Sequence, residues 1–425
     1  MKVLSDTFSS LKNKTFRIYF VGLFSSYLGY SIQSTVLGWL AYRLTGSSVL
    51  LGFVGFSIQL PLLVLGLFGG VIADRVDKRK ALILTQGLTA LQAFLLGILT
   101  ITGLIQIWQI LVLSLIWGTI TAFTIPTRHS FTFDLVGKKD LSNALALNTS
   151  ISHISRILGP GIAGFMVGYF SEGPCFLINS ILVMMLVFVL FKINVKSTHR
   201  EEKHLPILQS LKSGLNYAWK NSFLRYPLLL LLMVSLVVMP TMVLMPIVVK
   251  KIFQGDAQTL GILLSCFGAG SLVGSLFLAA RKEKKGLTLT IAIAGLIYGL
   301  SLTAFALSKN LFLSCFLLAL AGAGMSYQAV GINITLQTFT ANNMRGRIMS
   351  LYMITFVGLA PFGSIILGKL ADVVGIASTM LICGILITLS ATWFFSKISL
   401  IKISAYRIFI KERKASRSEG IEPIL

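Results

Sequence analysis

Residues 69–80 of the chain read GGVIADRVDKRK and lie between two long apolar runs. Gly70 allows two helices to approach closely. Asp74 supplies a hydrogen-bond acceptor at a helix end, and the basic side chains that follow hold such a turn at the level of the lipid headgroups. The stretch therefore predicts a tight turn that joins two membrane-spanning helices. A charge cluster that only fixes topology is the alternative.

The rest of the chain repeats this alternation of apolar run and short polar turn. It is 55% hydrophobic and 12% charged, whereas a soluble domain carries about a quarter charged residues. A spanning helix needs about 20 mostly apolar residues, and a barrel strand is about half as long. Twelve runs have the helical length: 17–42, 48–72, 81–103, 106–127, 145–170, 174–194, 226–250, 258–280, 288–308, 310–335, 348–371 and 376–396. We expect an all-α membrane protein with twelve transmembrane helices.

The net charge of +23 is distributed asymmetrically between the turns. Most of the 37 Lys and Arg residues fall at the termini and in every second turn, and Arg156 lies within a run. The other turns hold Arg43, Lys250, Lys251, Lys309 and Lys369. Basic residues concentrate on the cytoplasmic side of polytopic proteins, so both termini are expected in the cytoplasm. The pattern also disfavours a nucleic-acid binder, which would gather its charge in one patch.

The longest polar stretch, 195–225, lies at mid-chain and separates six runs from six. It predicts an N-terminal half over 1–194, a cytoplasmic central loop over 195–225, a C-terminal half over 226–396 and a basic tail over 397–425. The tail favours either an amphipathic helix on the membrane or a disordered segment.

The two halves repeat each other at an offset of about 200 residues. Gly168, Glu172 and Pro160 in the first half correspond to Gly368, Asp372 and Pro361 in the second. Parallel repeats of this kind are related by an axis along the membrane normal, and the substrate site of such transporters lies between them near the midplane.

The turn at 69–80 resembles the G-x-x-x-D-R-x-x-R-K signature of the major facilitator superfamily. The matching residues are Gly70, Asp74, Arg75, Lys78 and Arg79, while Asp77 stands where a glycine is usual. The resemblance implies that this motif forms a cytoplasmic gate, in which Asp74 bonds across the two halves.

Two further stretches resemble the branch of enterobactin exporters and macrolide efflux pumps, the drug:proton antiporter family 3. They run from Pro126 to Asn179 and from Arg345 to Gly363. The resemblance covers essentially the whole chain. It implies a bacterial inner-membrane protein, and it places Arg128, Arg345 and Arg347 at the cytoplasmic gate.

Arg156 lies about midway along the fifth run, with His153 one turn earlier on the same face. An uncompensated cation in a membrane is costly, so Arg156 must face water, an anion or polar groups inside the bundle. One interpretation is that Arg156 attracts an anionic group of the substrate and His153 is a protonation switch. The alternatives are that Arg156 bonds backbone carbonyls and that His153 is a packing residue. No acidic residue falls within a run, so the usual proton carrier is missing from the sequence.

Polar and methionine side chains at helical spacing predict the lining of a central cavity, with packing between helices as the alternative. The candidates are Ser26, Tyr30 and Gln33 in the first run, Trp117, Thr121 and Thr124 in the fourth, and Met239 and Met242 in the seventh. Gly159, Pro160 and Gly161 predict a hinge where the halves meet, because proline interrupts the helical hydrogen bonds and glycine allows close contact.

These features favour a secondary-active exporter that moves a small amphiphilic compound, such as a siderophore or a macrolide-like drug, by alternating access. Proton antiport is implied by the resemblance. Partners are then the substrate, protons and membrane lipids, and the protein is expected to be a monomer that is not an enzyme. The four cysteines show no CxxC spacing, so no metal site is expected, and no cofactor motif occurs. A lysophospholipid-type lipid transporter and a non-transporting scaffold or sensor are the alternatives.

Overall fold

The computed structural model describes residues 9–193, 207–281, 286–341, 344–401 and 403. Its elements are a 3-10 helix η1 (Ser9–Lys12) and the α-helices α2 (Lys14–Thr45), α3 (Ser48–Arg75), α4 (Lys78–Ile101), α5 (Ile107–Phe170), α6 (Glu172–Lys192), α7 (Ile207–Lys220), α8 (Ser222–Val243), α9 (Met245–Lys251), α10 (Ala257–Ala279), α11 (Leu287–Leu307), α12 (Leu311–Phe339), α13 (Arg345–Gly358), α14 (Ala360–Val374) and α15 (Ile376–Ser396). The described residues are therefore helical throughout, joined by short turns.

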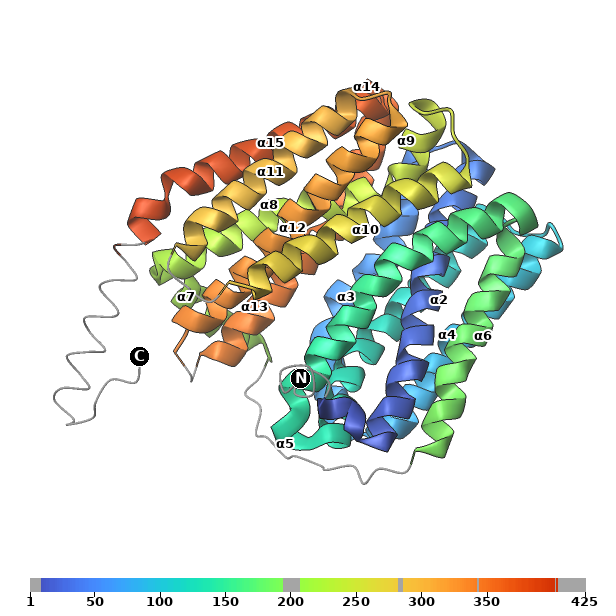
Figure 1. The fold of residues 1–425 in the computed structure, drawn as a ribbon, viewed down its shortest axis with the longest axis horizontal. Helices are drawn as coiled ribbons and strands as arrows, with labels where there is room; N and C mark the ends of the chain where they lie inside the picture. The colour runs from blue at the N-terminus through green and yellow to red at the C-terminus, as the bar shows by residue number, and fades with distance from the viewer. Residues whose placement is uncertain (1–8, 194–206, 282–285, 342–343, 402, 404–425) are drawn as a thin grey trace.

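The helices form two bundles that pack against each other (Figure 1). One contains α2 to α6 and the other α8 to α15, and each is held by contacts among its own helices. We call the end of the molecule that carries Arg79, Lys138, Lys192, Lys220 and Arg281 the basic end. The other end, with the turns at 46–47, 102–106, 171 and 308–310, is the opposite end.

In the described part of the chain, ten stretches of helix are long and apolar enough to cross a membrane, so the chain is a multi-pass membrane protein. Two further long helical stretches, α2 and residues 138–170 of α5, fall outside this set. Both are more polar along their length: α2 carries Ser25, Ser26, Ser31, Gln33 and Ser34. The expected count of twelve is thus supported for ten of the expected helices.

The helices depart from the expected runs and loops in four places. The polar stretch 128–140 is not a loop, because α5 runs through it and is interrupted at Gly137, whose φ of 69° and ψ of −178° suit glycine. The central loop contains the helix α7. The seventh and eleventh runs are each broken in two, just before Pro246 and Pro361, which lie in the first turn of the new helix, where proline is favoured because its missing N–H is not needed there.

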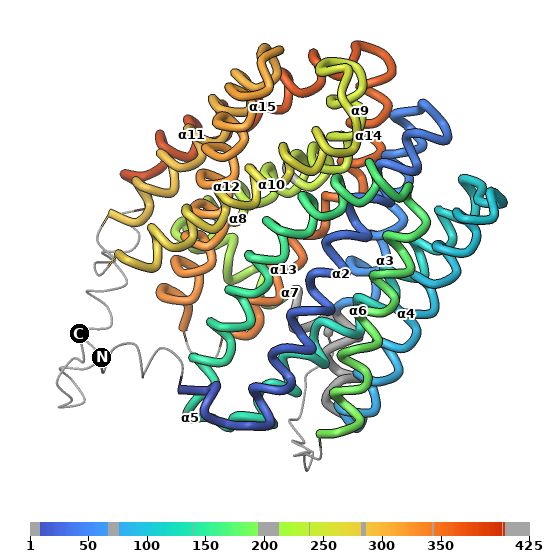
Figure 2. The backbone as a smooth tube through the Cα atoms, turned by 45° about the vertical axis from the view of Figure 1, so that its right-hand side comes forward, coloured from blue at the N-terminus to red at the C-terminus, as the bar shows by residue number. Residues whose placement is uncertain are grey.

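The bundles touch along two lines at the opposite end, where α3 meets α14 and α5 meets α10. Glycines allow this approach. A Cβ on Gly368 would lie 2.7 Å from the carbonyl oxygen of Ser48, and one on Gly261 would overlap that of Pro160. Figure 2 shows α5 and α10 side by side along this contact. Towards the basic end the bundles separate (Figure 1).

Asp256 caps the first turn of α10 beside this contact, at the opposite end. Its carboxylate accepts hydrogen bonds from the backbone N–H of Thr259 at 3.0 Å and from the Thr259 hydroxyl at 3.1 Å. The backbone hydrogen bond holds the pKa of Asp256 below its usual value. The cap fixes the end of α10 that packs against α5.

Candidate functional site

A cavity of about 610 Å³ lies between the two bundles. Its walls come from α2, α3, α4 and α5 on one side and from α8, α10, α12 and α13 on the other. It reaches from the opposite-end contact towards the basic end, where Arg128 and Tyr352 belong to its lining. A cavity shared by both bundles is a place where one ligand can contact both.

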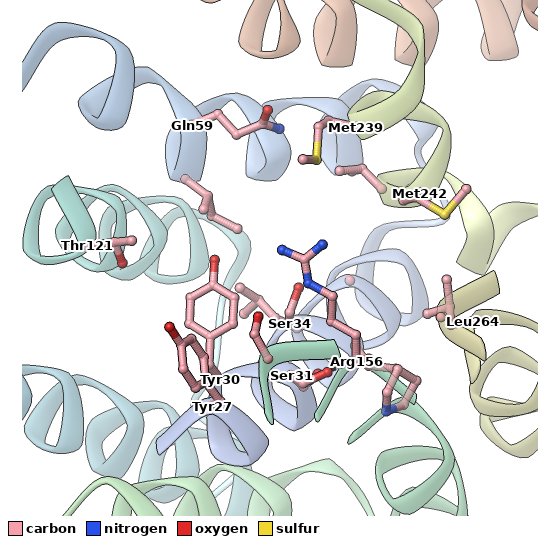
Figure 3. A pocket seen from close by; sticks show the side chains of 18 of the residues that line it. Tyr27, Tyr30, Ser31, Ser34, Gln59, Thr121, Arg156, Met239, Met242 and Leu264 are labelled. Carbon is pink, nitrogen blue, oxygen red and sulfur yellow. Dashed lines mark hydrogen bonds between the residues drawn. The ribbon is translucent and has the colours of Figure 1, made fainter. Parts of the chain in front are cut away.

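Arg156 is the central charged group of this cavity. It is an exposed residue about midway between the break of α5 at Gly137 and its end at Phe170, and Figure 3 shows its guanidinium pointing into the space between Tyr30, Gln59 and Met239. The ion pairs of the described residues join Arg43 to Glu172 and Lys78 to Asp134, so neither of them neutralises Arg156. Its charge is available to a ligand.

Two further basic side chains, His153 and Arg128, line the same cavity. The buried Nδ1 atom of His153 has no hydrogen-bond partner. Arg128 lies with its guanidinium carbon 4.6 Å from the ring centre of Tyr27, which is a cation–π contact.

Acidic side chains are missing from the part of this lining that the structure describes. A cavity with two arginines and no carboxylate has a positive potential, because its low-dielectric walls screen those charges weakly. It favours an anion over a cation.

Aromatic and polar side chains form the wall on the side of α2. The rings of Tyr30 and Trp117 are 4.6 Å apart and tilted by 46°. Ser26 donates a hydrogen bond of 2.8 Å to Gln86 of α4. The hydroxyls of Thr121 and Thr124 donate to carbonyls of their own helix, so they can offer a ligand only an acceptor.

Met239 and Met242 come from α8 and face Arg156 across the cavity (Figure 3). Methionine adapts its shape to different partners. This wall suits the apolar part of a ligand whose charged part lies near Arg156.

Gln33, in contrast, lies apart from the cavity lining and is fully buried. It donates a 3.0 Å hydrogen bond to Gln92 and accepts one from Asn179, while Gln92 donates to the carbonyl of Leu113 at 3.2 Å. This network joins α2, α4, α5 and α6, so Gln33 stands among the groups that hold the first bundle together.

The expected hinge residues lie where α5 touches its neighbours. Pro160 has no N–H for the carbonyl of Arg156, and α10 approaches that carbonyl so closely that a Cβ on Gly268 would be 2.7 Å from it. Gly159 faces Ser31 of α2, and Gly161 faces Ser265 of α10.

The residues of the 69–80 motif lie at the basic end. Gly70, Asp74 and Arg75 belong to the last turns of α3, and their side chains are outside the described part of the structure. Lys78 forms a buried ion pair of 2.9 Å with Asp134 of α5. Arg79 donates to the carbonyls of Leu190 and Phe191, both at 2.8 Å.

Arg345 and Arg347 begin α13 at the same end. Arg345 is exposed, and Arg347 donates a 2.9 Å hydrogen bond to Ser213 of α7. Both lie outside the cavity lining, in contrast to Arg128.

Several lining residues were not among the expected ones. They are Tyr27, Ser31, Ser34, Gln59, Gln86 and Phe356. The sequence holds a signal for some of them: Tyr27, Ser31 and Ser34 follow helical spacing, and Gln59 is the one amide in the run 48–72. The others depend on which face of each helix turns towards the second bundle.

Comparison with known families and proteins gives a consistent result. Residues 5–410 match the model of a family described as transmembrane secretion effector. The chain is 26% identical to the staphyloferrin A transporter of Staphylococcus aureus, over 87% of this chain and 92% of the relative. It is 24% identical to the multidrug efflux pump Tap of Mycolicibacterium fortuitum, over 83% and 88%. It is 23% identical to macrolide efflux protein A of Streptococcus pyogenes, over 84% and 89%.

Solved structures share the fold at low sequence identity. The nucleoside transporter NupG superposes with a TM-score of 0.72 at 14% identity, over 90% of this chain and 99% of that one. An inward-facing, unoccupied bacterial homologue of the lysosomal transporter Spinster superposes with a TM-score of 0.70 at 10% identity, over 93% and 97%.

Proposed function

Because the chain belongs to the transmembrane secretion effector family of major facilitator transporters, we propose that it exports a small anionic amphiphile from the cytoplasm by alternating access. Its family and relatives are transporters and not enzymes. The single observation that carries the substrate class is the cavity, which contains Arg156 and Arg128 without a carboxylate in its described lining.

The relatives and the charge pattern support the outward direction of transport that we propose. Two of the three relatives compared above are named efflux proteins. The positive-inside pattern places the basic end in the cytoplasm, so the cavity opens inward. We propose twelve crossings, cytoplasmic termini and a monomer whose halves, 1–194 and 226–396, rock about the opposite-end contact.

Among anions, a siderophore of the polycarboxylate class fits the cavity best. Carboxylates bind arginine through two parallel hydrogen bonds, and one relative is named for transport of staphyloferrin A. The methionine and aromatic walls accept the carbon skeleton. Macrolides carry a basic amine, which would meet Arg156 and Arg128 with no carboxylate to pair with.

Coupling to protons is the second part of the proposal. His153 supplies an imidazole to the described cavity lining, a group that can take up and release a proton, and it lies one helical turn from Arg156. We propose that His153 binds the proton that is exchanged for the substrate, so that proton and substrate occupy the cavity in turn.

The experiment is export under iron starvation. We would compare a deletion strain with strains that carry the wild-type gene, Arg156→Gln, Arg156→Lys or Lys309→Gln, and measure secreted and intracellular metabolites. Lys309 is exposed at the opposite end, far from the cavity, and serves as the control. A hydrogen bond to a charged group contributes about 1.5–3 kcal/mol, so we expect Arg156→Gln to lower export about tenfold or more.

Each outcome decides between substrates. A chelator that is retained by the deletion and Arg156→Gln strains but released by wild type and Lys309→Gln supports a siderophore exporter. Unchanged metabolites combined with macrolide susceptibility in the deletion strain alone would replace this proposal by drug efflux, as in macrolide efflux protein A. Equal export by wild type and Arg156→Gln would refute the role of Arg156.

A further inference from the structure

Helix α7 (Ile207–Lys220) lies at the basic end and has three distinct faces over its described side chains, residues 212–220. One face is buried against the C-terminal bundle and contains Gly214 and Ala218, one turn apart. A Cβ on Gly214 would lie 3.2 Å from the Cβ of Arg347. The neighbouring Ser213 accepts a 2.9 Å hydrogen bond from the same arginine. The helix is therefore docked on α13.

The second face is apolar and uncovered. Leu215 and Trp219, four residues apart, are 53% and 58% exposed. The third face, next to it around the helix, consists of the exposed residues Lys212, Asn216 and Lys220. A helix with adjacent apolar and cationic faces is typical of the boundary between lipid headgroups and acyl chains.

The side chains around Trp219 are also typical of the boundary between lipid headgroups and acyl chains. The guanidinium of Arg225 lies 5.7 Å from the ring of Trp219 and 4.8 Å from that of Tyr226. Tyr226 in turn packs edge-on against Trp393, which is 38% exposed, with 5.7 Å between ring centres. Tryptophan, tyrosine and arginine gather where spanning helices leave the membrane.

We infer that α7 is a membrane-surface helix that binds anionic phospholipid of the cytoplasmic leaflet. Leu215 and Trp219 enter the lipid, while Lys212 and Lys220 contact the phosphates. The partner is the membrane because the cationic face adjoins the apolar one at the level of an aromatic belt. The inference uses the cytoplasmic position of the basic end and is independent of the substrate.

The consequence concerns the cavity. α7 holds the first turns of α13 through Arg347, and α13 contributes Tyr352 and Phe356 to the cavity lining. A change in how α7 contacts the charged leaflet would therefore be passed on to α13, which lines the cavity.

The first test uses fluorescent labels on the full-length protein in vesicles. Single cysteines replace Leu215 or, as the matched control, Asn216, in a background without the four native cysteines. We expect the Leu215 label to be quenched by doxyl-bearing lipid and protected from aqueous iodide, and the Asn216 label to show the reverse. Iodide quenching of the Leu215 label equal to that at Asn216 would overturn the inference, as would protection from both quenchers, because protein would then cover this face.

The second test addresses the lipid charge. Lys212→Gln/Lys220→Gln is compared with wild type in phosphatidylcholine vesicles with and without phosphatidylglycerol, using the lipid quenching of the Leu215 label. We expect phosphatidylglycerol to increase quenching in wild type, and each lost lysine to weaken this response about fivefold. If phosphatidylglycerol increases quenching equally in the double variant and in wild type, then Lys212 and Lys220 do not bind the anionic lipid and this part of the inference is wrong.

Discussion

At the scale of single residues, the buried ion pair between Lys78 and Asp134 gives a prediction about stability. The two side chains are 10% and 1% exposed and 2.9 Å apart. Breaking a buried ion pair by removing one member is destabilising, by about 3–5 kcal/mol. We expect Asp134→Ala to lower the free energy of unfolding by this amount, measured by denaturation of the purified protein in micelles.

Two further variants separate the ion pair from other causes. Lys78→Met/Asp134→Leu replaces both charges by apolar groups of similar volume and should recover most of the lost stability. Lys80→Met removes an exposed lysine two residues away and should change stability by less than about 0.5 kcal/mol. A double variant as unstable as Asp134→Ala would mean that the pair is not the cause.

Single residues also show which features of the cavity could be predicted from the sequence. The sequence predicted that Arg156 faces water, an anion or polar groups inside the bundle, because a mid-membrane arginine is otherwise costly, and Arg156 does line the cavity. It did not distinguish Gln33, which is enclosed by Gln92 and Asn179, from Ser26, which lines the cavity. Both follow the same helical spacing, and which neighbour covers a side chain depends on tertiary packing.

At the scale of elements, the contact between α5 and α10 depends on glycine. A Cβ on Gly261 would overlap the carbonyl oxygen of Pro160 and lie 3.2 Å from the Cα of Gly164. Because backbone atoms cannot rotate away, we expect Gly261→Ala to destabilise the protein by about 1–3 kcal/mol. Gly87 of α4 has no atom within 4 Å of such a Cβ, so Gly87→Ala should be neutral or slightly stabilising. Thermal unfolding of both variants in one detergent makes the comparison, and equal melting temperatures would contradict it.

Helices could be predicted from the sequence where an apolar composition alone requires a membrane span. The apolar runs gave the spanning helices because a membrane requires internally bonded backbone. The connections were harder. Charged residues at 128–140 favoured a loop, yet only Gly137 leaves the helical conformation there. α7 lay unseen inside a polar stretch, because its apolar residues are interspersed with polar ones and form no continuous run.

At the scale of the whole molecule, the fold class and the position of the cavity between two repeated halves followed from the sequence, through the mid-chain polar stretch and the matched positions in the two halves. The conformation, that is, the relative position of the two bundles, could not be predicted from the sequence. That the bundles touch at the opposite end and separate at the basic end is one of several states that the same helices can adopt, and only their relative position in space distinguishes these states.

Alternating access therefore predicts that the opposite-end contact must open during transport. A Cβ on Gly168 of α5 would lie 3.3 Å from Cγ of Gln258 of α10, so cysteines at these two positions are close enough to be joined by oxidation. In a background without the native cysteines, we expect the Gly168→Cys/Gln258→Cys protein to lose transport on oxidation and to regain it on reduction. The control is Gly97→Cys/Leu177→Cys, which joins α4 to α6 inside one bundle, where a Cβ on Gly97 would lie 2.9 Å from Cγ of Leu177. Oxidation should leave its transport unchanged, because each bundle moves as a unit. Undiminished transport by the fully oxidised 168–258 protein would show that the bundles do not separate there, and the rocking motion of the two halves would have to be abandoned.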